Sequence, residues 1–354
     1  MLYREVGQFK TSYQADQAIF PIREDRIGLV VILLIAVVVL PLVANEYWLR
    51  TLLTPFLIYA LAAVGLNLLT GYAGQVSLGT GGFMGVGAYA AYNIGIWLPW
   101  LNIIAVLLLA GLVAAGIGIL FGLPSLRIKG FYLAVATLAA QFFLSWAFIR
   151  VPWVTHYSPN SSITFQPIVL FGLPVTSSAG CYLFTLGIVM VLTLVAKNLV
   201  RGNAGRAWMA IRDMDIAAEI IGIRPLRTKL LAFAVSSFYC GIAGALLAQV
   251  FLGSVEPAAF DLDRSFAILF MIIIGGLGSI LGCFLGSAFM TLLPILLNRV
   301  PTALGLPLGT ATISHIEYMT FGALIIFFLI VEPNGLARLW QIGKEKLRLW
   351  PFPH

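Results

Sequence analysis

Charged residues are scarce in this chain of 354 residues, and their scarcity is the first constraint on what the protein can be. Asp, Glu, Lys and Arg together make up 10% of the sequence, whereas hydrophobic residues make up 60% and mean hydropathy is +0.99. A soluble domain carries about 25% charged residues. The composition therefore excludes an ordinary soluble protein and predicts an all-α integral membrane protein.

Histidine and cysteine are also rare, with three of each. The cysteines lie far apart in apolar stretches, which excludes a disulfide framework or a metal-ligand motif and predicts small buried residues. The sequence lacks a phosphate-binding GxxxxGK[ST] loop, an HExxH motif and a nucleophile–histidine arrangement. We therefore expect no catalytic residue, metal or cofactor on this chain, and a membrane enzyme or a scaffold is the least favoured interpretation.

Long apolar stretches fill most of the sequence. A membrane-spanning helix needs about 20 apolar residues, and ten stretches approach that length: 27–44, 51–70, 72–95, 98–122, 130–149, 180–198, 230–252, 266–279, 280–297 and 314–331. The last residues of 266–279 include Gly275-Gly276-Leu277-Gly278-Ser279, and such a run favours a break because each glycine weakens a helix by about 1 kcal/mol. We expect about ten transmembrane segments, some of them broken or short.

The basic residues are distributed unevenly along this topology. If the loop 197–229 is cytoplasmic, 17 of the 21 Lys and Arg residues lie on its side: four in the N-terminal tail, two near residue 128, seven in the loop and four in the C-terminal tail. Cytoplasmic connections carry such an excess, so we expect no nucleic-acid partner for this charge. The count holds only if 266–297 crosses twice. It predicts cytoplasmic tails, 1–26 and a basic 332–354, around a transmembrane domain at 27–331.

Acidic side chains are nearly absent from the predicted spans. Proton- and sodium-coupled carriers often use Asp, Glu and His residues within the membrane. Their absence disfavours an ion-coupled secondary carrier. It favours a passage for a net-neutral solute, driven by energy that enters from another protein.

Two glycine-rich stretches, 71–95 and 275–287, combine glycine with polar side chains. Irregular backbone at membrane depth is tolerated only where it packs in protein or lines a cavity, and transporters place substrate sites at such interruptions. Tight helix packing through pairs such as Gly81 and Gly85 explains the pattern equally well. The candidate pathway residues are Asn67, Gly74, Gln75, Ser77, Gly79, Thr80, Gly276, Gly278 and Ser279.

The loop 197–229 is the longest interior stretch that cannot cross a membrane. It holds seven of the 21 basic and three of the 14 acidic residues. A helix from Ala207 to Gly222, ending at the glycine, is predicted by apolar residues at helical spacing: Ala210, Ile211, Met214, Ala217, Ala218 and Ile221. A plain solvated connector is the alternative. An apolar face needs a cover, which is the rest of the chain, the lipid surface or another protein.

Three runs of sequence carry a resemblance to a known family. They are GYAGQVSLGTGGFMGVGAYAA, GRAWMAIRDMDIAAEIIGIRPLRTKLLAFAVSSFYCGIAGAL and IIIGGLGSILGCFLGSAFMTLLP, in that order. Together they resemble permease subunits of ABC importers for branched-chain amino acids, more closely the longer, M-type subunit. The resemblance implies a multi-pass protein of the bacterial inner membrane. It also implies a second permease subunit, two cytoplasmic ATPases that bind ATP and Mg, and a periplasmic substrate-binding protein.

In ABC importers a permease loop carries a short coupling helix with an E-A-A-x-x-x-G core that docks on the ATPase. Here Ile216 stands where the pattern has Glu, while Ala217, Ala218 and Gly222 keep the spacing. The resemblance therefore implies an ATPase-coupling loop whose candidate residues are Arg206, Arg212, Asp215, Ala217, Ala218, Glu219 and Gly222. Its arginines, Arg224 among them, are expected to pair with acidic groups on the ATPase.

The solute is less closely defined by the resemblance. Family relatives carry leucine, isoleucine and valine, and near relatives carry urea, short amides or other amino acids. An amino-acid zwitterion is net neutral and so is urea, so the uncharged spans suit both.

Overall fold

The structure, a computed structural model, is helical apart from two short pairs of strands among the residues it describes. It describes residues 11–12, 23–125, 131–155, 157–158, 162–165, 169–170, 173–174, 177–303, 310–332 and 334–349. Most of the predicted tail 1–26, and the basic residues Arg127 and Lys129, lie outside these ranges.

Each of the ten predicted apolar stretches contains a helix. In chain order these are α2 (Arg23–Leu34) with η1 (Ile35–Val39) and α3 (Leu40–Val43); η2 (Trp48–Leu53), α4 (Thr54–Asn67) and η3 (Leu68–Tyr72); α5 (Thr80–Trp97); α6 (Ile103–Ser125); α7 (Phe131–Arg150); α8 (Ser178–Arg201); α11 (Pro225–Leu246) with η4 (Leu247–Leu252); α12 (Leu262–Gly275); α13 (Ile280–Ala303); and α14 (Thr310–Val331). Within the described residues, seven helices are long and apolar enough to cross a membrane. The mostly helical, multi-span class is confirmed, and the count of ten crossings stays a prediction.

Two interruptions divide the apolar stretches where glycine is concentrated. The first break, residues 73–79, separates η3 from α5, so the predicted span 72–95 is wrong over its first eight residues. The second break, residues 276–279, separates α12 from α13 as the glycine run indicates. Gly276 and Gly278 there have φ angles of +117° and +75°, which residues with a Cβ rarely adopt.

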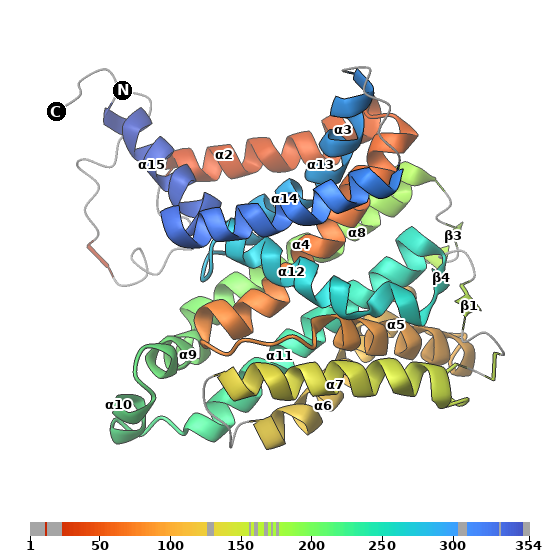
Figure 1. Cartoon of the computed structure of the whole chain (residues 1–354), viewed down its shortest axis with the longest axis horizontal. Coiled ribbons are helices and arrows are strands. Elements are labelled where there is room, and N and C mark those ends of the chain that lie inside the picture. Colours follow the sequence, from red (N-terminus) through yellow and green to blue (C-terminus); the bar gives the residue numbers. More distant parts are fainter. Residues whose placement is uncertain are drawn as a thin grey trace.

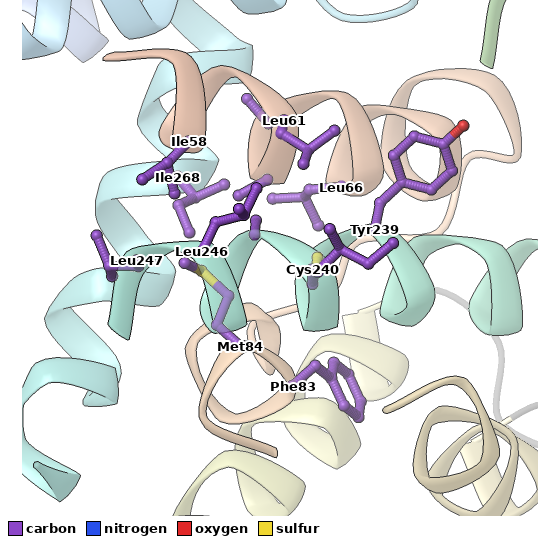
Figure 2. Packing of buried hydrophobic residues seen from close by; sticks show 14 of the residues in the cluster. Ile58, Leu61, Leu66, Phe83, Met84, Tyr239, Cys240, Leu246, Leu247 and Ile268 are labelled. Carbon is purple, nitrogen blue, oxygen red and sulfur yellow. The ribbon is translucent and has the colours of Figure 1, made fainter. Parts of the chain in front are cut away.

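Helix α11 lies at the centre of the packed core, against α4, α5 and α6. Backbones approach closely: a Cβ on Gly87 of α5 would lie 2.0 Å from the Gly241 carbonyl oxygen, and one on Gly244 would lie 1.9 Å from that of Met84. Figure 2 shows Met84, Tyr239 and Cys240 in the side-chain layer around this crossing. Small residues permit these close contacts between helix backbones. In a membrane such packing drives helix association, because lipid supplies no hydrophobic driving force.

The three cysteines are free thiols, and Cys240 and Cys283 are fully buried, as predicted from their apolar surroundings. Cys181 is half-buried. They fill space among helices.

The two ends of the helix bundle differ in their connections. One end carries α9 (Asn203–Asp213), α10 (Asp215–Ile220) and α15 (Gly335–Leu349), the last of which makes the predicted C-terminal tail largely helical. The opposite end carries β1 (Ile163–Thr164), β3 (Leu173–Pro174) and β4 (Ser254–Val255) (Figure 1), with β2 (Val169–Leu170) beside β3. The 3₁₀ turn η5 (Pro257–Phe260) follows β4 and packs against α5 and α7. Strand β1 pairs antiparallel with β4, and β2 with β3.

Candidate functional site

The loop between α8 and α11 folds into two short helices, α9 and α10, which we call the α9–α10 hairpin. Helix α9 ends where the Met214 N–H donates to the Ala210 carbonyl at 3.0 Å, and Met214 itself is extended, with φ −154° and ψ 100°. The single helix predicted from Ala207 to Gly222 is therefore wrong. Aspartate flanks Met214 on both sides, and Asp disfavours helix interiors because its carboxylate competes for nearby backbone N–H groups.

Trp208 anchors the hairpin to the membrane-spanning helices. Its side chain is fully buried, and its Nε1 donates to the Thr228 carbonyl at the start of α11, at 3.0 Å. Gly205 packs so tightly on the end of α8 that a Cβ there would lie 2.0 Å from the Val200 carbonyl oxygen. The hairpin is therefore held against both α8 and α11.

Gly222 turns the chain away after α10, as the sequence predicts. Its φ is +91°, and its N–H donates to the Glu219 carbonyl at 3.0 Å. The Ile223 N–H donates to the Ala218 carbonyl at 3.0 Å, so carbonyls at the end of α10 are bonded. No atom lies within 4 Å of a Cβ placed on Gly222. The position needs glycine for its backbone conformation, and space around it is free.

Four large apolar side chains of the hairpin are exposed, by 68% to 80%. We call them the apolar tip: Met214, Ile216, Ile220 and Ile221. The apolar face predicted for a single helix does not form, because Ile211 and Ala218 face inward and are buried. Ala217 and Glu219 are exposed beside the tip. Nothing within the described residues covers this surface.

Two of the charged residues predicted for coupling bond within the loop itself. Arg206 donates from Nη1 to the Arg201 carbonyl at 3.3 Å and from Nη2 to the Asn203 side chain. Asp215 lies 4.0 Å from the Lys229 ammonium group. These contacts brace the hairpin against its own flanking helices.

Arg212 reaches from α9 to the first break. Its Nη1 donates to the Gly71 carbonyl at 3.0 Å, and its Nε pairs with Asp213 at 2.9 Å. A Cβ on Gly74 would lie 2.8 Å from the Arg212 Cγ. The guanidinium group therefore links the loop to the membrane-spanning core, a contact that the sequence pattern does not indicate.

Asn67, the last residue of α4, is hydrogen-bonded to the second break. Its Oδ1 accepts from the Gly278 N–H at 2.9 Å, and its Nδ2 donates to the Ser279 carbonyl at 3.1 Å. A Cβ on Gly71 would lie 2.4 Å from the Gly278 nitrogen, so the two backbones touch. We call the set Asn67, Gly71, Arg212, Gly278 and Ser279 the break junction. Three candidates of the predicted pathway, Asn67, Gly278 and Ser279, thus meet Arg212 of the predicted coupling loop at one point.

Four of the candidates at the first break and the start of α5 are buried, Gln75, Ser77, Gly79 and Thr80, whereas Gly74 is exposed. Gln75 is 4% exposed, and neither its Nε2 nor its Oε1 has a hydrogen-bond partner among the described residues. The Thr80 hydroxyl is likewise buried and unpartnered there. Ser77 accepts from the Gly79 N–H at 3.4 Å, which stabilises the turn into α5. The break therefore holds polar atoms whose bonding the described protein does not complete.

The start of α5 is capped by two side chains from other helices. The Gly82 N–H donates to Gln141 Oε1 of α7 at 2.5 Å, and the Gly81 N–H donates to Ser265 Oγ of α12 at 2.8 Å. Gln141 Nε2 donates a hydrogen bond to the Phe260 carbonyl at 2.8 Å. Sequence reasoning missed Ser265, since nothing local signals a partner 184 residues away. These bonds satisfy helix N–H groups that would otherwise attract a ligand.

Gly276 lies apart from the break junction. A Cβ on it would lie 2.4 Å from the Asn334 carbonyl oxygen, at the start of α15. The second break therefore contacts Asn67 through Gly278 and Ser279, and it contacts the start of α15 through Gly276. Within the described part of the chain, no three His, Cys, Asp or Glu side chains gather where they could hold a metal ion.

Comparison with known proteins shows the same kind of protein throughout. The sequence matches the family described as branched-chain amino acid transport system, permease component, over residues 48–329. It is 30% identical to the high-affinity branched-chain amino acid transport system permease protein LivM of Salmonella typhimurium, over 80% of this chain and 68% of that one. The LivM of Escherichia coli is 30% identical over 79% and 68%.

More distant relatives are named for other solutes. The ribose import permease protein RbsC of Haemophilus influenzae is 26% identical over 78% of this chain and 82% of its own. No solved structure matches the chain. Permease subunits of ABC importers are multi-pass inner-membrane proteins and not enzymes; their energy comes from separate ATPase subunits, and a substrate-binding partner delivers the solute. By its match over residues 48–329, this chain belongs to the family of branched-chain amino acid transport permeases.

Proposed function

We propose that this chain imports branched-chain or closely related amino acids, as one of two permease subunits of the transporter. Two observations support the solute: the family match and the LivM names of relatives at 30% identity. The candidate spans carry few charges, which suits a zwitterion that is neutral overall. A second permease subunit completes the path in this proposal.

The observation that carries the mechanism is the α9–α10 hairpin with its apolar tip. Four exposed apolar side chains on a braced element form a surface that association would bury favourably. In our proposal the tip, with Ala217 and Glu219 beside it, docks in a groove of the ATPase. Glu219 and Asp215 provide acidic groups near the tip, where Ile216 replaces the Glu of the family pattern.

The break junction then carries the motion into the membrane-spanning core. ATP binding draws the two ATPases together and displaces both coupling hairpins. Arg212 pulls on the Gly71 carbonyl, and Asn67 links that segment to Gly278 and Ser279. Both breaks shift together, because short unwound segments bend more easily than continuous helices. The chain performs no covalent chemistry.

The first break is proposed as part of the solute path. A buried amide without partners costs about 1–3 kcal/mol, so Gln75 is retained at an energetic disadvantage unless its hydrogen bonds are used in function. Thr80 adds a second such group. Gln75 and Thr80 are proposed to contact the solute or its hydration shell during passage, while Ser77, Gly74 and Gly79 shape the backbone that presents them.

We further propose ten crossings with both termini cytoplasmic. The charge distribution supports this, as does the placement of α15 at the same end of the bundle as α9 and α10 (Figure 1). A cysteine substituted at Asp263 should react with a membrane-impermeant maleimide added outside intact cells, and one at Asn203 should not. The opposite pattern would refute the orientation.

Uptake by reconstituted transporter tests the proposed function. Proteoliposomes with both permeases, ATPases and binding protein should take up leucine with ATP, and uptake should persist when an ionophore collapses ion gradients. Excess isoleucine or valine should compete, whereas urea and ribose should not. Competition by urea or ribose alone would contradict the solute. Uptake by the permeases without ATPases would refute the coupling mechanism.

A further inference from the structure

Helix α15 presents a basic, amphipathic surface that the transport mechanism does not use. It carries four basic residues and a single acid, Glu345. Leu336 packs against the hydrophobic core, whereas Leu339 and Trp340 are exposed by 48% and 58%. Helices with exposed apolar side chains beside Lys and Arg lie at membrane surfaces, and Trp favours the headgroup level.

The start of α15 is fixed against the second break. A Cβ on Gly335 would lie 2.6 Å from both the Gly276 nitrogen and the Ile274 carbonyl oxygen. Gly335 has a φ of +65°, and its N–H donates to the Glu332 carbonyl at 2.8 Å. Helix α15 therefore begins in close contact with the end of α12 and with the second break.

A cavity of about 440 Å³ lies between α15 and the second break. Its polar lining consists of two cations, Arg338 and Lys344, the amide groups of Asn334 and Gln341, and Ser279. Its apolar lining includes Trp340 and Leu281, the latter at the start of α13 and 45% exposed. None of its described lining residues is acidic. The cavity thus pairs a cationic, hydrogen-bonding part with an apolar side.

We propose that this cavity binds the headgroup of an anionic phospholipid of the cytoplasmic leaflet. The two cations and the amide donors match a phosphodiester group. The acyl chains continue past Leu281 along α13, where Leu292 and Leu296 are also exposed. This apolar continuation favours a lipid over free phosphate or an acidic protein surface, because basic pockets beside membrane helices on the cytoplasmic side select anionic headgroups.

The bound lipid ties α15 to the segment that flanks the break junction. It contacts Ser279 and Leu281 on one side and Arg338 on the other. The Ser279 carbonyl is itself held by Asn67. Anionic lipid therefore stabilises the second break.

Native mass spectrometry of the assembled transporter tests the proposal. The purified complex is titrated with phosphatidylglycerol, with phosphatidylcholine as the zwitterionic reference. The combined variant Arg338→Gln/Lys344→Gln should weaken phosphatidylglycerol binding by about tenfold, since two charged contacts to the headgroup are lost. Lys346→Gln, on the same helix but outside the cavity lining, is the matched control and should change binding less than about twofold.

Every other outcome overturns the proposal. Equal losses in the combined variant and in Lys346→Gln would show general surface attraction. Equal binding of phosphatidylcholine would show no headgroup recognition, and displacement by millimolar inorganic phosphate would assign the cavity to free phosphate. Unchanged lipid binding with less ATPase in the purified complex would assign α15 to the ATPase. Thermal midpoints of all variants, compared beforehand, show that each complex is folded.

Discussion

At the scale of single residues, Gly71 and Asn67 make the close contacts of the break junction. Gly71 lets the backbone of η3 touch the second break, and Asn67 accepts from the Gly278 N–H and donates to the Ser279 carbonyl there. In a membrane an unpaired backbone group costs several kcal/mol. Asn67 therefore satisfies two backbone groups of the unwound segment.

A methyl group at Gly71 should disrupt this contact. In Gly71→Ala the Cβ would lie 2.1 Å from Asn67 Oδ1 and 2.4 Å from the Gly278 nitrogen, and the second atom is backbone. We expect a loss of about 1–3 kcal/mol of stability, as for overpacked cores, and strongly reduced uptake. Thermal unfolding of the purified complex and an uptake assay measure both effects.

Gly95→Ala is the control for that substitution. It lies near the end of α5, where no atom approaches within 4 Å of the new Cβ. Alanine there should stabilise the helix by about 0.5–1 kcal/mol or leave it unchanged. If the two variants unfold at the same temperature and transport equally, the close contact between the breaks does not exist in the protein.

At the scale of elements, the sequence predicted what depends on local pattern. Apolar runs located all ten helical stretches, and the glycines at 275–279 and Gly222 marked a break and a helix end. The apolar spacing continues through Met214, and this pattern predicts one helix at 207–222. In the structure the helix stops at Met214, because an aspartate stands on each side of it. Local preference overrode periodicity there.

The contacts that make the site could not be predicted in this way. Arg212 and Gly71 are 141 residues apart in the chain, and Asn67 and Ser279 are 212 apart. Their meeting depends on how α4, α9 and α13 pack, and one sequence carries no record of that packing. The resemblance implies a role for Arg212 toward the ATPase, and the structure adds a bond from its guanidinium group to the Gly71 carbonyl.

At the scale of elements, a charge placed in the apolar tip of the α9–α10 hairpin should weaken binding of the ATPase. Ile220 is 80% exposed, so Ile220→Asp should leave the chain folded, yet it places a charge in the surface proposed to enter the ATPase. We expect about a tenfold loss of co-purified ATPase or more, since central apolar contacts dominate interfaces. Ile216→Glu is the comparison, because it restores the E-A-A-x-x-x-G pattern and should retain the ATPase.

Quantified co-purification with unchanged thermal midpoints decides this prediction. Full retention of the ATPase by Ile220→Asp would remove the apolar tip from the interface. An equal loss in both variants would show that the tip tolerates no acid, and that the family pattern does not apply to this hairpin.

At the scale of the whole molecule, the proposed mechanism joins three parts in series: the apolar tip, the break junction and the buried polar groups of the first break. The tip is exposed, and Trp208 and Gly205 hold the hairpin against α11 and α8. Arg212 is the link between that hairpin and the breaks. Transport driven by a separate ATPase requires such a connection, because the chain has no nucleotide-binding motif of its own.

The ratio of solute imported to ATP hydrolysed, measured with the reconstituted transporter, tests this connection most directly. Arg212→Gln should keep the ATPase bound and active but lower the ratio at least about fivefold, the lower end of typical coupling between sites. Arg227→Gln removes an exposed arginine of the same loop and should keep the ratio of the unmodified protein. If Arg212→Gln and Arg227→Gln give the same ratio, Arg212 does not carry the ATPase's motion into the membrane.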